Sequence, residues 1–370
     1  MKTYLCLAVS LLAGGSAFAI EPAPALKDAF AKDFRIGAAI SAGMTKPGHP
    51  AYALLLQQFN SITPANLLKW GPYNPKPGVF NEEAAETYFA FGQAHGMYTV
   101  GHTLFWHQQT PPWVFQNENG GDASRAQLLQ RMRERVNHLA KLYGTRTAAW
   151  DVVNEAFLDD GTLRVSPFTR ILGDDFLPEA FRIAQEELPS SVTFLYNDYN
   201  LEAPAKVQAV VREIGKLRSL GLRVDAVGNQ AHWRLESPTI AEIEASLLAL
   251  KAANVKVHYT ELDIEVLPRA VSGAEITARA ALTADNNPYP NGLPPAVQEK
   301  LAQRYAAIFA LFHKHADVIE RVTFWGVTDA DSWLNNWPVR GRTNYPLLFD
   351  RAGQPKPGLE AVLGVVAKQP

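Results

Sequence analysis

The sequence predicts a single (β/α)8 TIM barrel, an α/β fold in which eight parallel strands close into a ring and each strand precedes a helix. Short apolar runs alternate with amphipathic stretches along all 370 residues. The runs are nearly continuous in hydrophobic residues, as expected for parallel strands buried on both faces. No linker or low-complexity block divides the chain. An open doubly wound sheet is the alternative, but no glycine-rich dinucleotide turn follows the first run.

The expected strands occupy residues 34–41, 61–66, 98–106, 148–155, 193–200, 224–230, 257–264 and 321–329. Helical patterns lie between them. In residues 124–143 the hydrophobic side chains of Leu128, Met132 and Val136 recur near the 3.6-residue period, and Gly144 ends the pattern. Further helices are expected at 205–220, 239–253 and 295–315, with a loop at 282–295.

The overall composition indicates a neutral binding partner. The chain has 35 Lys and Arg residues against 37 Asp and Glu residues. This balance disfavours nucleic acid and anionic membranes as partners. A neutral polymer or a small polar molecule fits better.

The first residues have the pattern of an export signal. Lys2 precedes an apolar run at residues 5–12, and residues 17–19 read Ala-Phe-Ala. We expect residues 1–19 to be a cleaved signal peptide and 20–370 to form the catalytic domain, in the periplasm or outside the cell. Cys6 is the only cysteine, so the mature chain is expected to lack disulfides and cysteine-metal sites.

Polar and aromatic residues gather at the predicted carboxyl ends of the strands, where barrel active sites lie. Glu155 and Glu261 stand out, because each follows an apolar run. The other candidates at these ends are Asn66, Lys69, His102, Trp106, Asn154, Asn197, Tyr199, Gln230, His232, Asp263, Trp325 and Trp333.

This set of side chains favours a carbohydrate site. Carboxylates, amides and imidazoles can bond several hydroxyls, and tryptophan faces can stack on sugar rings. A phosphate site would need more Arg and Lys, and the histidines lack the spacing of zinc ligands. We therefore expect no metal and no cofactor. His138, His313 and His315 lie on helical segments, and we interpret them as surface or packing residues.

Each candidate also has a structural interpretation. A single glutamate at a strand end is often paired with a neighbouring cation, and the tryptophans and His232 alone are typical of a packed core. Two carboxylates three strands apart, each beside polar partners, instead favour cleavage of a glycosidic bond.

Six groups of motifs, in order along nearly all of the mature chain, resemble the family 10 glycoside hydrolases, which are barrel-type endo-β-1,4-xylanases. They are residues 101–107 with 110–113, 150–155 (Trp-Asp-Val-Val-Asn-Glu), 164–168 with 171–173, 260–263 (Thr-Glu-Leu-Asp), 324–329 with 332–334, and 346–350.

The resemblance implies a role for each candidate. Glu155 resembles the general acid/base and Glu261 the nucleophile of a retaining double displacement, with their carboxyl groups about 5–5.5 Å apart. His232 and Asp263 resemble the pair that orients Glu261, and Asn154 the residue that binds the 2-hydroxyl. The resemblance further implies that Trp325 and Trp333 form an aromatic floor and wall, and that Asn197 and Tyr199 lie nearer the acceptor side. The residues that it places along the donor side are Asn66, Lys69, His102, Trp106 and Gln230.

The chain departs from the family pattern at two strand ends. Ala65 stands where the family usually has a glutamate that bonds the second donor-side sugar. Asn229 stands where an apolar residue usually precedes the glutamine, and Trp233 is expected to add an aromatic side chain near the cleft mouth. We expect the second donor subsite to be weakened or redirected.

Three functions remain open. The first is a retaining endo-1,4-β-xylanase that acts on xylan or xylo-oligosaccharides as a monomer. The alternative, which Ala65 keeps open, is a related retaining β-glycosidase that acts on decorated, short or aryl β-glycosides. A remote alternative is a sugar-binding barrel without catalysis, which the presence of both carboxylates disfavours.

Overall fold

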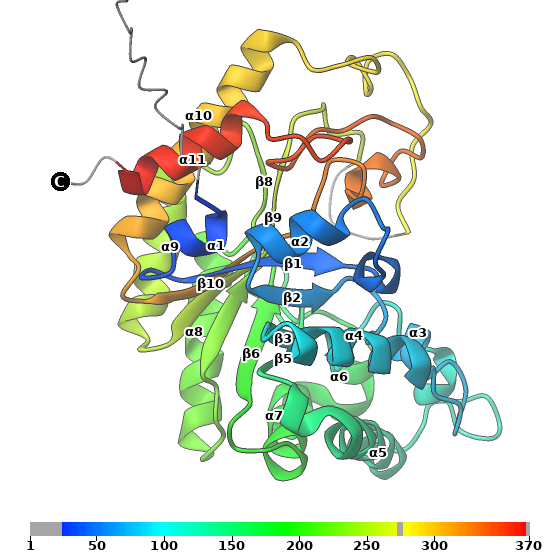
Figure 1. The fold of residues 1–370 in the computed structure, drawn as a ribbon. Coiled ribbons are helices and arrows are strands. Elements are labelled where there is room, and N and C mark those ends of the chain that lie inside the picture. The colour runs from blue at the N-terminus through cyan, green and yellow to red at the C-terminus, as the bar shows by residue number, and fades with distance from the viewer. Residues whose placement is uncertain (1–23, 272–276, 368–370) are drawn as a thin grey trace, which may run out of the picture.

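The computed structural model describes residues 24–271 and 277–367, and it confirms the predicted barrel. Eight parallel strands form a closed ring in the order β10-β1-β2-β3-β5-β6-β7-β9, and β9 pairs with β10 to complete it. Figure 1 shows the strands at the centre with the helices around them. The ring consists of β1 (Arg35–Ile40), β2 (Ser61–Pro64), β3 (Tyr98–Gly101), β5 (Ala149–Asn154), β6 (Thr193–Asp198), β7 (Ala226–Asn229), β9 (Lys256–Glu265) and β10 (Ile319–Phe324).

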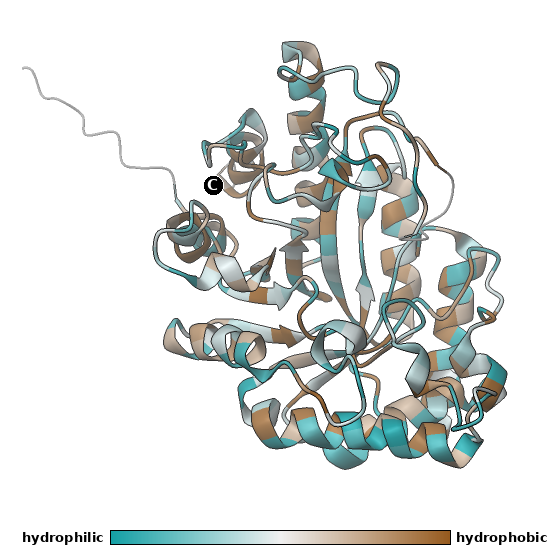
Figure 2. Ribbon diagram, turned by 90° about the vertical axis from the view of Figure 1, so that its right-hand side faces the viewer, coloured by the Kyte–Doolittle hydropathy of each residue, from teal (hydrophilic) through white to brown (hydrophobic). Residues whose placement is uncertain are grey.

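A longer helix follows each strand of the ring. In chain order these are α2 (Tyr52–Gln58), α4 (Glu82–Ala94), α5 (Arg125–Tyr143), α7 (Phe176–Glu187), α8 (Pro204–Ser219), α9 (Ile240–Ala252), α10 (Pro295–Lys314) and α11 (Pro357–Ala367). Shorter helices are α1 (Leu26–Ala29), α3 (Trp70–Tyr73) and α6 (Pro167–Leu172). The helices mix hydrophilic and hydrophobic residues along their length, as amphipathic helices do (Figure 2).

Local sequence signals explain where the predicted helices begin. The side chain of Ser124 caps α5 and that of Thr239 caps α9, and the backbone N–H of each cap residue donates in return to the side chain three residues on. α8 and α10 each start with a proline, whose missing N–H is not needed in the first helical turn. The predicted helices therefore agree with the structure to within one residue at either end.

The predicted third strand is interrupted. It forms β3 and the two-residue β4 (Phe105–Trp106), and both pair with β5. Gly101 pairs with Trp150 and Phe105 pairs with Val153. Phe105 is four positions after Gly101, whereas Val153 is only three positions after Trp150, so the segment between β3 and β4 contains one extra residue, which bulges out. A Cβ at Gly101 would lie 2.2 Å from the Trp150 ring, so this close approach requires glycine.

The predicted sixth strand ends earlier than expected, and a strand that the sequence did not predict follows it. β7 stops at Asn229, Ala231 takes a left-handed conformation (φ 59°), and β8 (His232–Arg234) then pairs with the end of β9. The turn at Ala231 breaks the pairing between β7 and β9 and places His232 beside Asp263.

The hydrophobic core lies mainly between the strands and the helices. Phe30, Phe34, Phe309 and Phe312 pack together there, with ring centroids 5.2 to 6.4 Å apart. Within the described residues, no helix combines the length and apolar character needed to cross a membrane. The predicted signal peptide, including Cys6 and Ala19, lies outside the described residues.

Candidate active site

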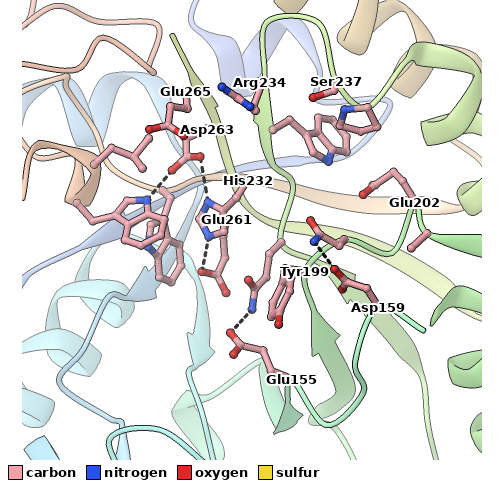
Figure 3. A pocket seen from close by; sticks show the side chains of 18 of the residues that line it. Glu155, Asp159, Tyr199, Glu202, His232, Arg234, Ser237, Glu261, Asp263 and Glu265 are labelled. Carbon is pink, nitrogen blue, oxygen red and sulfur yellow. Dashed lines mark hydrogen bonds and ion pairs between the residues drawn. The ribbon is translucent and has the colours of Figure 1, made fainter. Parts of the chain in front are cut away.

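A cavity of about 450 Å³ opens at the carboxyl ends of the strands. It brings together all of the predicted site residues except Asn66 and Asn197, which do not line it. Figure 3 shows Glu155 and Glu261 facing the same space from different strands. The predicted residues that line the cavity are Lys69, His102, Trp106, Asn154, Glu155, Tyr199, Gln230, His232, Glu261, Asp263, Trp325 and Trp333.

The Glu155 carboxyl group is held by donors from three strand ends. It follows β5, takes a left-handed conformation (φ 59°) and is 6% exposed. Trp106 Nε1 donates to Oε2 at 2.9 Å, and Gln230 Nε2 donates to Oε1 at 2.9 Å. Asn154 Nδ2 also donates to Oε1, at 3.2 Å. These bonds fix the direction in which the carboxyl group faces the cavity.

The environment of Glu155 favours its protonated form. Burial is the largest influence and raises the pKa of Glu155, and the charges of Asp198 and Glu261 add to the increase. The hydrogen bonds from Gln230 and Trp106 oppose it without reversing the direction. A carboxyl group of this kind can supply a proton.

Glu261 lies in β9 with its carboxyl group between two donors. Asn197 Nδ2 donates to Oε1 at 3.0 Å, and His232 Nε2 lies 3.2 Å from Oε2. The other ring nitrogen of His232 lies 3.0 Å from Asp263 Oδ1, and Trp333 Nε1 donates to Asp263 Oδ2 at 2.8 Å. Figure 3 shows this chain of contacts from Glu261 through His232 to Asp263.

The pKa of Glu261 is shifted in the opposite direction from that of Glu155. Burial alone would raise its pKa, but His232, His102 and Lys69 outweigh burial, so the pKa of Glu261 is lowered. Burial also disfavours the charged form of His232, yet Asp263 and Glu261 raise the pKa of this imidazole to about 10. A protonated imidazole can donate to both carboxylates, which keeps Glu261 ionised. One carboxyl group therefore favours its proton and the other loses it.

The predicted donor side is built around Lys69. Its ammonium group lies 4.8 Å from the Trp106 ring centroid and donates to Asn66 Oδ1 at 3.0 Å. Burial lowers the pKa of Lys69 to about 8, although Glu261 and Glu155 act to raise it. Asn66 is itself exposed, so the structure places it as a partner of Lys69 rather than in the cavity wall.

His102 and Trp325 complete this side of the cavity. The His102 ring nitrogen Nδ1 lies 2.8 Å from Asp151 Oδ2, and the rings of His102 and Trp325 meet edge to face at 5.5 Å. Asp151 is 1% exposed and does not itself line the cavity. It fixes the orientation of His102.

Asn197 lies beneath the two carboxyl groups. It is fully buried, donates to Asn154 Oδ1 and Glu261 Oε1, and accepts a bond from Thr260 Oγ1. A Cβ at Gly228 would lie 2.2 Å from Asn197 Oδ1, so glycine makes room for this amide. The structure therefore places Asn197 as a support of the pair rather than on the acceptor side of the cavity.

Tyr199 lines the cavity and is held by two cations that the sequence interpretation did not include. Arg164 Nη2 donates to its hydroxyl at 2.7 Å, and Lys206 Nζ lies 3.7 Å from its ring centroid. Lys206 is fully buried and pairs with Asp198 at 2.8 Å. A buried lysine needs such a partner, but the position of Lys206 in the first turn of α8 gave no sign of that contact.

Trp233 corrects one expectation. The sequence suggested an aromatic side chain near the cleft mouth, but Trp233 is only 3% exposed. It packs against Tyr259 and Phe312, at centroid distances of 5.7 and 6.3 Å, while still lining the cavity. The neighbouring strand β9 and helix α10 supply these apolar partners, which the local sequence does not reveal.

The three histidines expected on helical segments have structural partners. His138 stacks on Phe80 at 3.7 Å, His313 lies 2.6 Å from Asp33, and His315 lies 2.7 Å from Glu244. In the part of the chain that the structure describes, no group of three or more His, Cys, Asp or Glu side chains could hold a metal ion.

Comparison with known proteins reveals close similarity to xylanases. The family model for glycosyl hydrolase family 10 matches residues 25–365. The chain is similar to endo-1,4-β-xylanase A of Xylanibacter ruminicola, with 38% identity over 364 residues that cover 98% of each protein. It is also 38% identical to an endo-1,4-β-xylanase of Geobacillus stearothermophilus, over 92% of this chain and 98% of that relative.

Solved structures of xylanases are similar to this chain as well. A GH10 endoxylanase retrieved from a sugarcane soil metagenome has a TM-score of 0.88 and 44% identity, covering 92% of this chain and 99% of its own. A mutant solved in complex with xylotriose has a TM-score of 0.83 and 32% identity, with coverage of 92% and 99%.

Proposed function

The chain belongs to glycosyl hydrolase family 10, a family of glycoside hydrolases, and we propose that it is a retaining endo-1,4-β-xylanase. One observation carries this proposal. Two buried carboxyl groups share one cavity, and the pKa of Glu155 is raised while that of Glu261 is lowered. This is the division between acid and nucleophile that a retaining glycosidase needs.

In the first step, ionised Glu261 attacks the anomeric carbon of the donor sugar. The bond between that carbon and the bridging oxygen breaks, and Glu155 gives its proton to the departing oxygen. His232 and Asn197 hold the attacking carboxylate in place through their contacts with its two oxygens. The product of this step is a glycosyl ester on Glu261 and a free acceptor chain.

In the second step, the same groups release the donor sugar. Ester formation removes the negative charge of Glu261, so the pKa of Glu155 falls and its carboxylate can take a proton from water. The resulting hydroxide equivalent attacks the anomeric carbon and frees Glu261. Two inversions give net retention, and we expect a carboxyl separation of about 5–5.5 Å rather than the ~9 Å of inverting enzymes.

The stereochemistry of the first product tests this proposal. Proton NMR during hydrolysis of xylohexaose is expected to show the β-anomer first, with the α-anomer appearing only by mutarotation. An initial α-anomer would indicate inversion. No hydrolysis by the pure wild-type protein would instead support the sugar-binding alternative.

Sugar binding is proposed for the residues around the pair. Asn154 lies between Glu155 and Asn197, so its amide can bond the 2-hydroxyl of the sugar being cleaved, a contact that strengthens in the transition state. Trp325 and Trp333 offer ring faces for stacking, and Lys69, His102 and Gln230 offer polar contacts. The relative solved with xylotriose supports a xylo-oligosaccharide as the ligand.

We propose that Ala65 weakens the second donor subsite. Ala65 directly follows β2, is partly exposed and contributes only its backbone N–H, which donates to Ile40 at 3.0 Å. A glutamate here could make charge-assisted bonds worth about 1.5–3 kcal/mol each. Ala65→Glu is therefore expected to raise kcat/KM for xylotriose roughly tenfold, whereas Ala65→Leu, which adds bulk without acceptors, is not. Equal kcat/KM for the wild type and Ala65→Glu would contradict the proposal.

The charge of Asp198 is expected to shift the alkaline limit of activity, which the pKa of Glu155 sets. Its charge helps to keep Glu155 protonated, and Asp198→Asn would remove that charge while leaving Lys206 in place. The pKa of Glu155 then falls, so the acid form is lost at lower pH and the alkaline limb of kcat/KM moves to lower pH. Asp225→Asn, at the opposite end of the barrel, serves as the control. An unmoved or raised limb would contradict the assignment.

The alternative of a related β-glycosidase rests on Ala65 alone, and relative rates on xylan, arabinoxylan and aryl glycosides decide it.

We further propose that residues 1–19 direct export to the periplasm or beyond the cell and that residues 20–370 act as a monomer. N-terminal sequencing of the secreted protein and its mass in solution test these two points.

A further inference from the structure

Glu202 is a buried carboxyl group that lines the cavity, and the mechanism does not use it. It lies between β6 and α8 and lines the same space as Glu155 and Glu261. In Figure 3 it lies on the side of Tyr199 and Asp159, with its carboxyl group turned toward the cavity. Burial raises the pKa of Glu202, and Asn229 and Trp233 act against this increase.

Asn229 fixes Glu202 in this position. Asn229 Nδ2 donates to Glu202 Oε1 at 2.7 Å, and its Oδ1 accepts from the backbone N–H of Ala231 at 3.1 Å. Asn229 is 2% exposed, so its amide is held at both ends in a buried setting. An apolar residue at this position, as the family usually has, could make neither bond.

Glu202 keeps the capacity to bind a ligand. A carboxylate has about four acceptor positions, and the Asn229 bond uses one of them. In the neighbouring Asp159, both carboxylate oxygens already accept hydrogen bonds, because Asn200 donates to one at 3.0 Å and Lys206 to the other at 3.3 Å. Buried Trp233 also lies beside Glu202: its indole N–H acts on the carboxyl group, and its ring lines the cavity as an apolar surface. An acceptor next to an apolar wall is a common arrangement for a sugar ring.

The ring order places Glu202 on the acceptor side. Apart from Gln230, which follows β7 beside the reacting pair, the proposed donor-side residues lie on β2, β3, β4 and β10 or in the loops after them. Glu202 instead follows β6, and Asn229 ends β7. β5 and β9, which carry Glu155 and Glu261, separate these two arcs of the ring. A chain cleaved between the two glutamates therefore extends toward Glu202 on its leaving side.

We propose that Glu202 determines acceptor-side specificity by accepting hydrogen bonds from the hydroxyls of an undecorated xylose, with Asn229 as its positioning residue. This inference rests on the proposed function. A neutral sugar with two adjacent hydroxyls can donate to both oxygens of one carboxylate, as in other bidentate contacts. A substituent on either hydroxyl would remove a donor and add bulk against Trp233.

The test compares two substrates with different leaving groups. Xylohexaose places xylose units on the acceptor side, whereas 4-nitrophenyl xylobioside places there an aryl ring without hydroxyls. Glu202→Ala is expected to lower kcat/KM for xylohexaose roughly 10- to 100-fold more than for the aryl substrate, as expected for lost bonds to a charged group. Glu236→Ala, whose native side chain is 86% exposed, is the matched control and should leave the ratio of the two kcat/KM values unchanged.

A double-mutant cycle tests the role of Asn229. Asn229→Leu alone is expected to lower the ratio of kcat/KM for xylohexaose to that for the aryl substrate, because Glu202 loses its anchor. In the Glu202→Ala background the same substitution should change the ratio no further. Glu202→Gln, which can still accept the Asn229 bond, is the variant to use if Glu202→Ala does not fold. For Glu202→Gln, the ratio of kcat/KM for xylohexaose to that for the aryl substrate should fall, but less than for Glu202→Ala.

The outcomes separate this inference from the proposed function. Equal losses on both substrates would show that Glu202 has only a structural role, and no loss would show that it does not contact the acceptor. Either result overturns the inference. Failure of the wild type to cleave xylohexaose would instead overturn the proposed function.

Discussion

Replacing Glu261 with glutamine is expected to lower kcat/KM by roughly 10⁴-fold or more with every glycoside substrate. The amide cannot form the glycosyl ester, so a better leaving group does not restore the reaction. The surroundings are expected to tolerate the change, because Asn197 can still donate to the amide oxygen, and neutral His232 can accept a bond from the amide NH2 at Nε2. The loss should therefore appear in kcat, while the thermal unfolding midpoint stays near that of the wild type.

A matched control distinguishes chemistry from folding. Glu320 also lies on a barrel strand, in β10, but is half-buried and pairs with His258 away from the cavity. Glu320→Gln is expected to keep most of the activity. Comparable losses in the two variants, or activity in Glu261→Gln within about tenfold of the wild type, would contradict the assignment of Glu261 as the nucleophile.

Replacing Glu155 with alanine is expected to produce a loss that depends on the leaving group. With xylan the loss should be roughly 10²–10⁴-fold, because the departing sugar oxygen needs a proton. With 2,4-dinitrophenyl xylobioside the first step needs no acid, so the glycosyl ester should form quickly and accumulate. The alkaline limb of kcat/KM for xylohexaose, which Glu155 sets in the wild type, should disappear.

A small anion should restore turnover in that variant. Azide needs no general base, and the space left by Glu155→Ala admits it. We expect azide to increase the rate with the dinitrophenyl substrate and to give a β-glycosyl azide. A loss that is the same for all leaving groups and insensitive to azide would show that Glu155 is not the acid/base.

The barrel and the reacting pair could be predicted because their signals are local. A strand buried on both faces must be apolar along its length, so the run before Glu155 stands out, and so does a carboxylate at its end. Helix starts such as Ser124 and Thr239 are similarly visible in a few neighbouring residues.

The remaining features depend on contacts between distant parts of the chain. The interruption of the third strand arises from the fit of Gly101 against Trp150, and β8 arises from the turn at Ala231. The family resemblance implied that Asn197 lies nearer the acceptor side, but the space above Gly228 accommodates its side chain beneath the pair. Pairing preferences along one sequence do not specify such contacts.

The electrostatic partners were missed for the same reason. Burial, rather than the charge of Glu261, is the largest influence on Glu155, and the charge of Asp198 also acts on it. The contact between Asp198 and Lys206 joins a strand to the following helix. Asn229 was recognised as a departure from the family, but its bond to Glu202 became visible only in three dimensions.

The central claim is that Glu261 forms a covalent bond to the sugar while Glu155 transfers protons. Incubation with 2,4-dinitrophenyl 2-deoxy-2-fluoro-xylobioside, followed by intact mass and peptide mapping, tests it most directly. The fluorine slows both steps by destabilising the oxocarbenium-like transition state, and the good leaving group lets the ester form. We predict one fluoroxylobiosyl group per chain, attached to Glu261. An adduct on Glu155, or release of dinitrophenol in turnover without any adduct and with inverted product, would contradict the claim.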